Sequence, residues 1–306
     1  MPTQWGGVSY ESWAETCDTL HAHTQFLGKL AVALAPPEPQ LQHAALRLTA
    51  RGWETAPLPA PDGSGSLVVA LDLRNHEMVI ETSAKGSRRI ALAPNRAVGA
   101  VTREALDAIR QLTDRVDINM RPQEVSWTVP LDKDDIHAHY DPEQATSYLV
   151  AASHAALVLA EFRAPFRGRS TPVNAWWGSF DLAVSLFSGR PAAPPSNDFI
   201  MRNAMDSQEI AVGWWPGDPR YGHAAFYAYA HPAPDGFADA TLSPGPAHWD
   251  GALGEYILNW DDARNSSDPR SAALEFARSA FRHACAVCEW DSSLLVSIDG
   301  RPPPVV

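Results

Sequence analysis

Apolar residues recur along this chain in two rhythms. Spacings of three and four residues predict amphipathic helices, and the segments with this rhythm are 10–35, 102–112, 141–162 and 268–288. The prolines from Pro36 end the first of them. Asp141-Pro142 and Asp268-Pro269 provide a capping acid followed by a proline at the first helical position, which is typical of a helix start.

Alternation with a period of two predicts β-strands. The segments with this pattern are 44–49, 67–73, 78–82, 89–92, 171–190, 208–215, 222–231 and 254–260. Short turns join several of them, which indicates antiparallel meanders. The sequence therefore predicts an α+β fold, with antiparallel sheets flanked by long helices.

The polar segment 131–140 is interpreted as a linker. It divides the chain into an N-terminal α+β half, 1–130, and a C-terminal α+β half, 131–306, although one continuous domain is an open alternative. Each half runs in the order helix, strands, helix. An internal duplication is therefore a hypothesis, even though no residue-by-residue repeat supports it.

The longest strand-like run, 171–190, has two unlike faces. A period of two places Trp176 among core residues and places Trp177, Ser179 and Asp181 on the opposite face. That second face either meets solvent or lines a pocket.

Composition narrows the functional classes. With 306 residues, 45% of them hydrophobic, the chain is expected to be globular. The net charge of −12 and the absence of a basic patch with stacking aromatics argue against nucleic acid as a partner. No membrane span or signal peptide is evident, and three cysteines make no disulfide framework, so a cytoplasmic location is expected. The oligomeric state is not predicted.

Two motifs suggest redox or metal chemistry. Cys285 and Cys288 form a C-x-x-C, but they fall inside a predicted helix without a second pair and are interpreted as small buried residues. His21/His23 and His137/His139 are His-x-His pairs. A helix separates residues two apart by about 200°, which disfavours a shared metal at the first pair. No nucleotide or flavin motif is present, so the cofactor is unknown and no metal ligands are assigned.

The leading hypothesis is a protein, or an enzyme of unknown reaction, that binds a small organic molecule in an aromatic pocket on the C-terminal sheet. The candidate acid–base residues are Asp181, Glu209 and His21. The candidate binding residues are Trp177, Ser179, Asn174, Tyr227, Tyr229 and Gln25. The alternative is a non-catalytic interaction protein whose tryptophan-rich sheet packs on a partner or a second copy. A metal-dependent enzyme using His21, His137 and an aspartate is the third hypothesis.

Several runs together resemble an uncharacterised bacterial family of about this length, which is known only as a domain of unknown function. The runs are Thr19–Gln25 with Gly28-Lys29, Thr49–Gly52 leading to Pro57–Pro59, Trp177–Val184 with Phe187–Arg190, and Phe226–Tyr229. The resemblance covers nearly the whole chain and implies no known activity. Relatives carry histidine where this chain has Asn174 and Gln208, which implies a lost or altered family site if those histidines act in one.

Overall fold

The computed structural model describes residues 5–298, which form two compact units. The N-terminal unit comprises Ser9–Ser153 and Asn174–Asp181. The C-terminal unit comprises residues 5–8, 154–173 and 182–298 of the described chain. Each unit is therefore made of segments that are not contiguous in sequence. The predicted division into 1–130 and 131–306, which uses two contiguous segments, stays a prediction.

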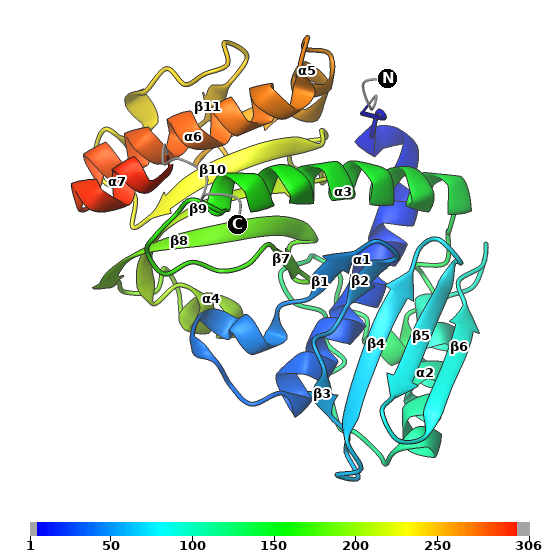
Figure 1. Cartoon of the computed structure of the whole chain (residues 1–306). Coiled ribbons are helices and arrows are strands. Elements are labelled where there is room, and N and C mark those ends of the chain that lie inside the picture. The colour runs from blue at the N-terminus through cyan, green and yellow to red at the C-terminus, as the bar shows by residue number, and fades with distance from the viewer. Residues whose placement is uncertain (1–4, 299–306) are drawn as a thin grey trace, which may run out of the picture. The chain divides into compact units, whose positions relative to one another are not determined.

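The four predicted helices form, as α1, α2, α3 and α6, and the described chain also contains shorter helices that the sequence did not predict (Figure 1). The N-terminal unit contains α1 (Tyr10–Leu34), η1 (Pro39–Ala44), α2 (Val98–Leu112) and η2 (Leu131–Lys133). α3 (Pro142–Arg163) begins in this unit and ends in the other. The C-terminal unit also contains α4 (Phe199–Ala204), η3 (Phe237–Asp239), α5 (Trp260–Arg264), α6 (Pro269–Val287) and α7 (Ser292–Ile298).

The two predicted aspartate–proline helix starts are confirmed. The carboxylate of Asp141 accepts hydrogen bonds from the backbone N–H groups of Glu143 and Gln144, at 2.8 and 3.2 Å. The carboxylate of Asp268 accepts one from Ser271 at 3.1 Å. Each aspartate therefore satisfies N–H groups that the first turn of a helix leaves without a helical partner.

The N-terminal unit contains one antiparallel sheet in the order β1-β2-β4-β5-β6, with β3 paired to β4. Its strands are β1 (Arg47–Thr49), β2 (Gly52–Glu54), β3 (Leu58–Pro59), β4 (Ser66–Asp72), β5 (Glu77–Thr82) and β6 (Gly86–Ala91). α1 packs on β4, and α2 packs on β5 and β6. The predicted meander is therefore confirmed, with helices covering one face of the sheet.

The C-terminal unit contains a second antiparallel sheet, in the order β11-β12-β10-β9-β8. Its strands are β8 (Asp181–Pro191), β9 (Ser207–Trp215), β10 (Ala225–His231), β11 (His248–Asp250) and β12 (Glu255–Asn259). α6 packs on β9, β10 and β12, and Phe281 of α6 meets Phe162 of α3 edge to face. Two antiparallel sheets flanked by helices confirm the α+β prediction (Figure 1).

The run 171–190 is not one strand, which corrects the faces assigned to it. β7 (Asn174–Trp176) ends before a turn over 177–180, and β8 begins at Asp181. The turn resets the alternation, so Trp177 is buried and Trp176 is partly exposed, the reverse of the prediction. β8 is buried on both faces from Asp181 to Phe187, so Asp181 and Ser185 do not face solvent.

Segment 131–140 is anchored to the N-terminal unit at several residues, which a free linker would not be. Leu131, Asp134 and Tyr140 are buried, and the backbone N–H of Gly99 in α2 donates to the carbonyl oxygen of Asp134 at 2.8 Å. The polar composition of the segment reflects hydrogen bonds inside the N-terminal unit.

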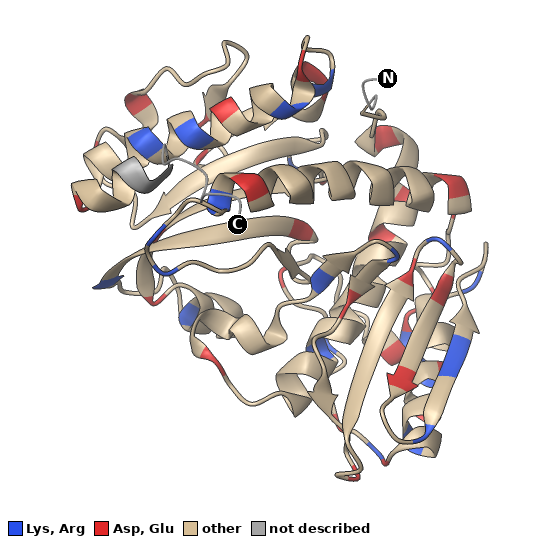
Figure 2. Ribbon diagram, viewed as in Figure 1, with Lys and Arg blue, Asp and Glu red and all other residues tan. Residues whose placement is uncertain are grey.

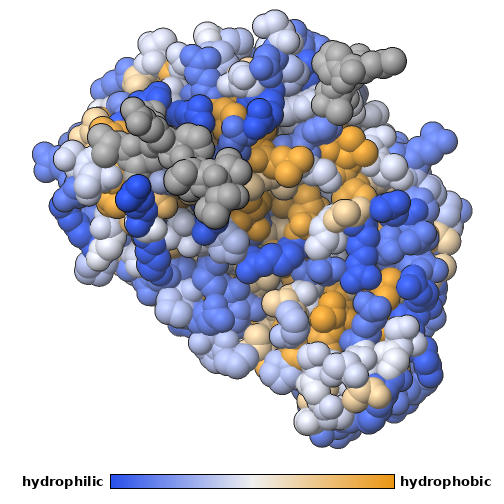
Figure 3. Space-filling model, viewed as in Figure 1, coloured by the Kyte–Doolittle hydropathy of each residue, from blue (hydrophilic) through white to orange (hydrophobic). Residues whose placement is uncertain are grey.

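Charged residues and apolar surface are distributed differently over the molecule. Acidic and basic residues are interspersed along the ribbon (Figure 2). Apolar surface gathers over α3 (Figure 3), where Val150 and Leu157 are 45% and 67% exposed. Among residues 5–298, α3 is also the helix whose length and composition would suit a bilayer, although half of it is buried.

Candidate functional site

A line of polar side chains follows one face of α1 in the N-terminal unit. Asp18, His21, Gln25 and Lys29 are three and four residues apart, so they share a face of the helix. Asp18 and His21 are partly exposed, whereas Gln25 and Lys29 are buried. We call these four residues the α1 polar stripe.

His21 and Gln25 lie one helical turn apart on α1 and bind the same turn of the protein. Nε2 of His21 donates to the carbonyl oxygens of Trp177 and Gly178, at 3.0 and 2.9 Å. The side-chain amide of Gln25 donates to the Trp177 carbonyl at 3.1 Å and exchanges two hydrogen bonds with the backbone of Gln123. Their common partner is therefore protein backbone.

Trp177 closes the buried end of the stripe. Its indole is 2% exposed and packs on Gly28, where an added Cβ would lie 2.1 Å from ring carbons. Nζ of Lys29 lies 5.3 Å from the centre of the ring and donates to Oε1 of Gln123 at 2.9 Å. The tryptophan is thus a wall of the stripe, and glycine at residue 28 makes room for it.

The turn that presents Trp177 is anchored by Phe180. Phe180 has a positive φ of 57°, which a bulky residue adopts only where packing imposes it. Its ring stacks on His21, Trp53 and Tyr148 at centroid distances of 5.0–5.2 Å. The aromatic stack therefore holds the strained turn against α1.

A histidine–carboxylate pair lies at the exposed end of the stripe. Oδ2 of Asp134 is 2.6 Å from Nδ1 of His137, and Oδ1 of Asp134 accepts the backbone N–H groups of Ile136 and His137. Burial raises the pKa of Asp134, but the hydrogen bonds from His137 outweigh it and leave this pKa below its usual value. The carboxylate is therefore ionised and fixes the imidazole ring.

Trp127 connects this pair to the stripe. Its ring lies 4.4 Å from the ring of His137 and 5.1 Å from the ring of His21, between centroids. Burial raises the pKa of Asp18, against the opposing charge of His137. Two partly exposed histidines, an indole and a carboxyl group thus lie together in one unit.

His23 is the most strongly perturbed histidine of this unit. It is buried, and its Nδ1 has no hydrogen-bond partner among the described residues. Burial lowers its pKa to about 4, although the charge of Asp134 acts in the opposite direction. His23 is therefore neutral near pH 7.

Two other predicted site residues of this unit bind protein groups. Oγ of Ser179 donates to the carboxylate of Asp181. Asn174 is fully buried, accepts a hydrogen bond from Nη1 of Arg47 at 2.5 Å and donates to Oε1 of Gln42 at 2.9 Å. Both contacts hold the ends of the turn over 177–180.

The remaining predicted residues lie on the sheet of the C-terminal unit. The register pairs Tyr229 with Ala211 and Tyr227 with Gly213, which puts both tyrosines on the same face as Glu209. The hydroxyl of Tyr229 donates to Glu209 at 3.2 Å. The alignment predicted for these two strands is present, but Trp177, Ser179, Asp181 and His21 belong to the other unit.

Glu209 is 5% exposed, and burial raises its pKa to about 7. Hydrogen bonds from Ser185 and Tyr229 and the charge of Arg169 act against this shift. A carboxyl group with a pKa near neutrality can hold or release a proton under physiological conditions.

Metal and redox chemistry find little support in residues 5–298. Within that range no three His, Cys, Asp or Glu side chains converge as metal ligands would. Cys17, Cys285 and Cys288 are free thiols, and burial raises the pKa of Cys285 to about 12. An unreactive thiol agrees with the interpretation of the C-x-x-C as a packing motif.

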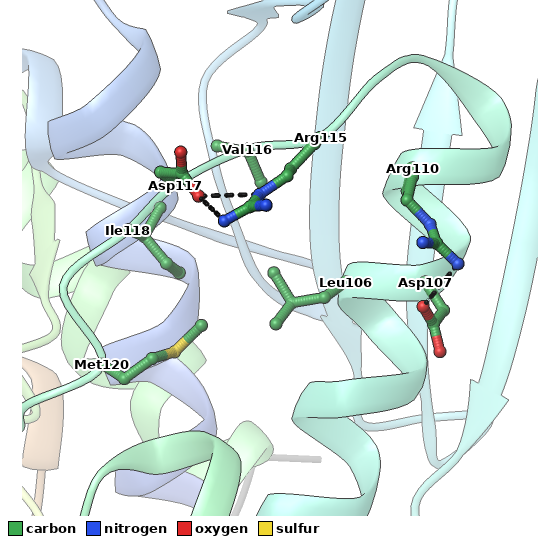
Figure 4. A pocket seen from close by; sticks show the side chains of 8 residues that line it. All are labelled: Leu106, Asp107, Arg110, Arg115, Val116, Asp117, Ile118 and Met120. Atoms are coloured by element: carbon green, nitrogen blue, oxygen red, sulfur yellow. Dashed lines mark hydrogen bonds and ion pairs between the residues drawn. The ribbon is translucent and has the colours of Figure 1, made fainter.

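A hollow of about 250 Å³ lies between α2 and residues 115–120 (Figure 4). Arg115 pairs with Asp117 at 2.8 Å, and Arg110 pairs with Asp107 at 3.3 Å. Its charged groups are already paired within the chain, and it contains none of the predicted site residues.

These contacts define an α+β protein with a polar stripe on α1. The turn at Trp177 packs on the buried end of this stripe, and the Asp134–His137 pair lies at its exposed end. The chain belongs to DUF5996, a family of unknown function whose model matches residues 5–297. The resemblance to an uncharacterised full-length family is thereby confirmed. No curated protein and no solved structure matches the chain.

Sequence reasoning missed three residues that the fold brings to this region. They are Lys29, Gln123 and Trp127. The three-and-four spacing on α1 could have added Lys29 to His21 and Gln25. Gln123 and Trp127 come from an irregular segment far away in sequence from α1, where no periodicity indicates direction.

Proposed function

We propose that the chain binds a small organic molecule at the exposed end of the α1 polar stripe and exchanges a proton with it through His137. One observation carries this proposal. Nδ1 of His137 is held 2.6 Å from a buried carboxylate, while no residue in the described chain bonds its Nε2.

The chemistry follows from that arrangement. A carboxylate at Nδ1 fixes the tautomer in which Nδ1 carries the proton, so the lone pair lies on Nε2. The same carboxylate stabilises the imidazolium that forms when Nε2 takes a proton. The His137 side chain is 13% exposed, so Nε2 serves as the general base toward a bound molecule.

The ring of Trp127 provides the binding wall of this centre. It is partly exposed and lies between the rings of His21 and His137. An indole contributes apolar contact to a small organic ligand beside a few polar groups, which is the usual composition of such sites. In this proposal His21 and Gln25 position the turn at Trp177 rather than meet the ligand.

A thermal-shift screen against small metabolites tests the proposal, with two neighbouring histidines compared. His139 is 53% exposed and lies two residues from His137, so His139→Gln is the matched control for His137→Gln. Ligands that stabilise the wild type should lose most of this effect in H137Q and keep it in H139Q. Equal stabilisation of both variants would refute the site.

Glu209 supports a second candidate centre of the same class, in the C-terminal unit. Its carboxyl group is buried beside the hydroxyl of Tyr229, and its pKa is raised to about 7. A Glu209→Gln variant that loses ligand-induced stabilisation, while H137Q retains it, would favour this centre over the first.

The interaction hypothesis has weaker support. Trp214, Trp215 and Trp260 are buried in the chain itself, so they offer a partner little indole surface. The exposed large apolar side chains of the described residues favour it, and these are Ile136, Val150, Leu157 and Phe199. A cytoplasmic location stays part of the proposal, and the three free thiols suit a reducing compartment.

A further inference from the structure

Lysine is rare in this chain, and one lysine is buried. Of 24 basic residues in the sequence, three are lysines: Lys29, Lys85 and Lys133. Lys85 and Lys133 are exposed, whereas Lys29 is 3% exposed. Arginine is generally the better residue for a buried ion pair, but only lysine can lose its proton and act as a nucleophile. A chain that otherwise uses arginine thus has a lysine at its most buried basic position.

We propose that Lys29 is a reactive amine that forms an imine with the carbonyl carbon of a small aldehyde or ketone. The proposal concerns a different group from His137 and holds whether or not His137 acts as a base. It rests on the surroundings of Nζ.

Among residues 5–298, no carboxylate pairs with the Lys29 ammonium. Its contacts in the described chain are a 2.9 Å hydrogen bond to the neutral amide oxygen of Gln123 and the face of Trp177 at 5.3 Å. Burial without a counter-charge disfavours the charged form and lowers the pKa of Lys29 to about 8. At pH 7.5 the fraction of free amine is therefore about two orders of magnitude above that of an exposed lysine.

The covalent step balances without any redox partner. The Nζ lone pair attacks the carbonyl carbon, a C–N bond forms, and the carbonyl π electrons move to oxygen. A proton passes from nitrogen to that oxygen and gives a carbinolamine. Hydroxide then leaves with the remaining N–H proton as water, and the C=N bond of the imine forms.

Gln123, which is uncharged, covers the Lys29 amine and is held in place by hydrogen bonds. Its backbone binds Gln25, and its side chain accepts from Lys29. A ligand carbonyl that displaces the side-chain amide of Gln123 would bring its carbon against Nζ of Lys29, and the Trp177 ring would flank that carbon. The ligand is therefore expected to displace one side chain.

Reductive labelling of the full chain tests this directly. The protein is treated at pH 7.5 with acetaldehyde and sodium cyanoborohydride, and ethylation at each lysine is followed by peptide mass spectrometry. Lys133 serves as the exposed internal control. We expect Lys29 to be labelled at least ten times faster than Lys133, with a rate that rises to a plateau above pH 8.

Two variants complete the test. Gln123→Ala should speed labelling of Lys29 several-fold and leave Lys133 unchanged, because it removes the covering amide. Lys85→Arg combined with Lys133→Arg leaves Lys29 as the single lysine and should retain its labelling. Labelling of Lys29 that is slower than that of Lys133, or that occurs only in urea, would overturn the proposal.

Discussion

The indole ring of Trp177 lies directly on the backbone of Gly28, two turns along α1 from His21. A Cβ at residue 28 would come within 2.1 Å of the ring, far inside van der Waals contact. Since the same indole lies beside Nζ of Lys29, the glycine also sets the position of the lysine. The absence of a side chain at Gly28 therefore allows the turn over 177–180 to pack directly on α1 beside the polar stripe.

Gly28→Ala should destabilise the protein, even though alanine is the better helix former by about 1 kcal/mol. The clash with the Trp177 ring exceeds that gain, and overpacking of this kind costs about 3 kcal/mol or more. Urea unfolding at pH 7 measures the change. Gly251→Ala is the control, because the nearest atom to its Cβ lies 3.8 Å away and no cost is expected there. Equal stability of G28A and wild type would contradict the packing.

Stability should fall as the pH decreases from about 6.5 to 4, because of His23. The folded-state pKa of this histidine is lowered to about 4 by burial, so in this window the unfolded chain binds a proton that the folded chain does not. The contribution of neutral His23 to the free energy of unfolding is fully present above pH 6.5. About 2 kcal/mol of it is lost as the pH falls from 7 to 5.

Urea unfolding of His23→Leu at pH 7 and pH 5 checks this expectation. The variant should show a smaller loss of stability between the two values, whatever its absolute stability. His248→Leu replaces an exposed histidine and should leave the loss as in wild type. A pH dependence that is the same in H23L and wild type would contradict a neutral buried His23.

Glu209 should give the opposite pH dependence. Its folded-state pKa is raised to about 7 by burial, so the stability it contributes is complete below pH 4.5 and is lost as the pH rises through 7. Glu209→Gln, which removes the titration, should therefore be more stable than wild type at pH 8 by up to about 3 kcal/mol. Thermal unfolding at pH 5 and pH 8 measures the difference, with the exposed Glu275→Gln as a control. A wild type as stable as E209Q at pH 8 would contradict the shift.

The hydroxyl of Tyr148 should stabilise the aromatic stack around Phe180. It accepts a hydrogen bond from Nε1 of Trp53 at 2.9 Å, and both residues are buried. Tyr148→Phe leaves that indole N–H without a partner and should cost about 1–3 kcal/mol in denaturant unfolding. Tyr221→Phe removes a partly exposed hydroxyl bonded to Asn259 and should cost less than about 1 kcal/mol. Similar losses of stability in Y148F and Y221F would contradict a larger contribution from the buried hydrogen bond.

Much of the secondary structure is predictable from local rules. α1 ends before the prolines at 36 and 37, and α3 and α6 begin at aspartate–proline pairs, because caps and prolines act within one helical turn. The meander of the N-terminal sheet follows from short turns between alternating segments. These features depend on neighbours in sequence.

Local rules fail to predict which residues of the run 171–190 are buried. A period of two assumes an unbroken strand, but Phe180 adopts a positive φ and the chain turns. Nothing in the run itself demands this conformation, since the rings that stabilise it belong to His21, Trp53 and Tyr148. The assignment of Trp177 to the face opposite the core is wrong for that reason.

The sequence by itself determined the fold class, the family and the positions of the four long helices. Only the tertiary structure decided that His21 and Gln25 meet the backbone of Trp177, that Asp134 holds His137, and that Lys29 has an amide as its polar partner. The physical reason is distance along the chain. Periodicity reports which side of an element a residue lies on, whereas the partners of Gln25 and Lys29 come from segments roughly a hundred residues or more away. Asp134 and His137 are three residues apart, but they lie in an irregular segment where no periodicity indicates direction.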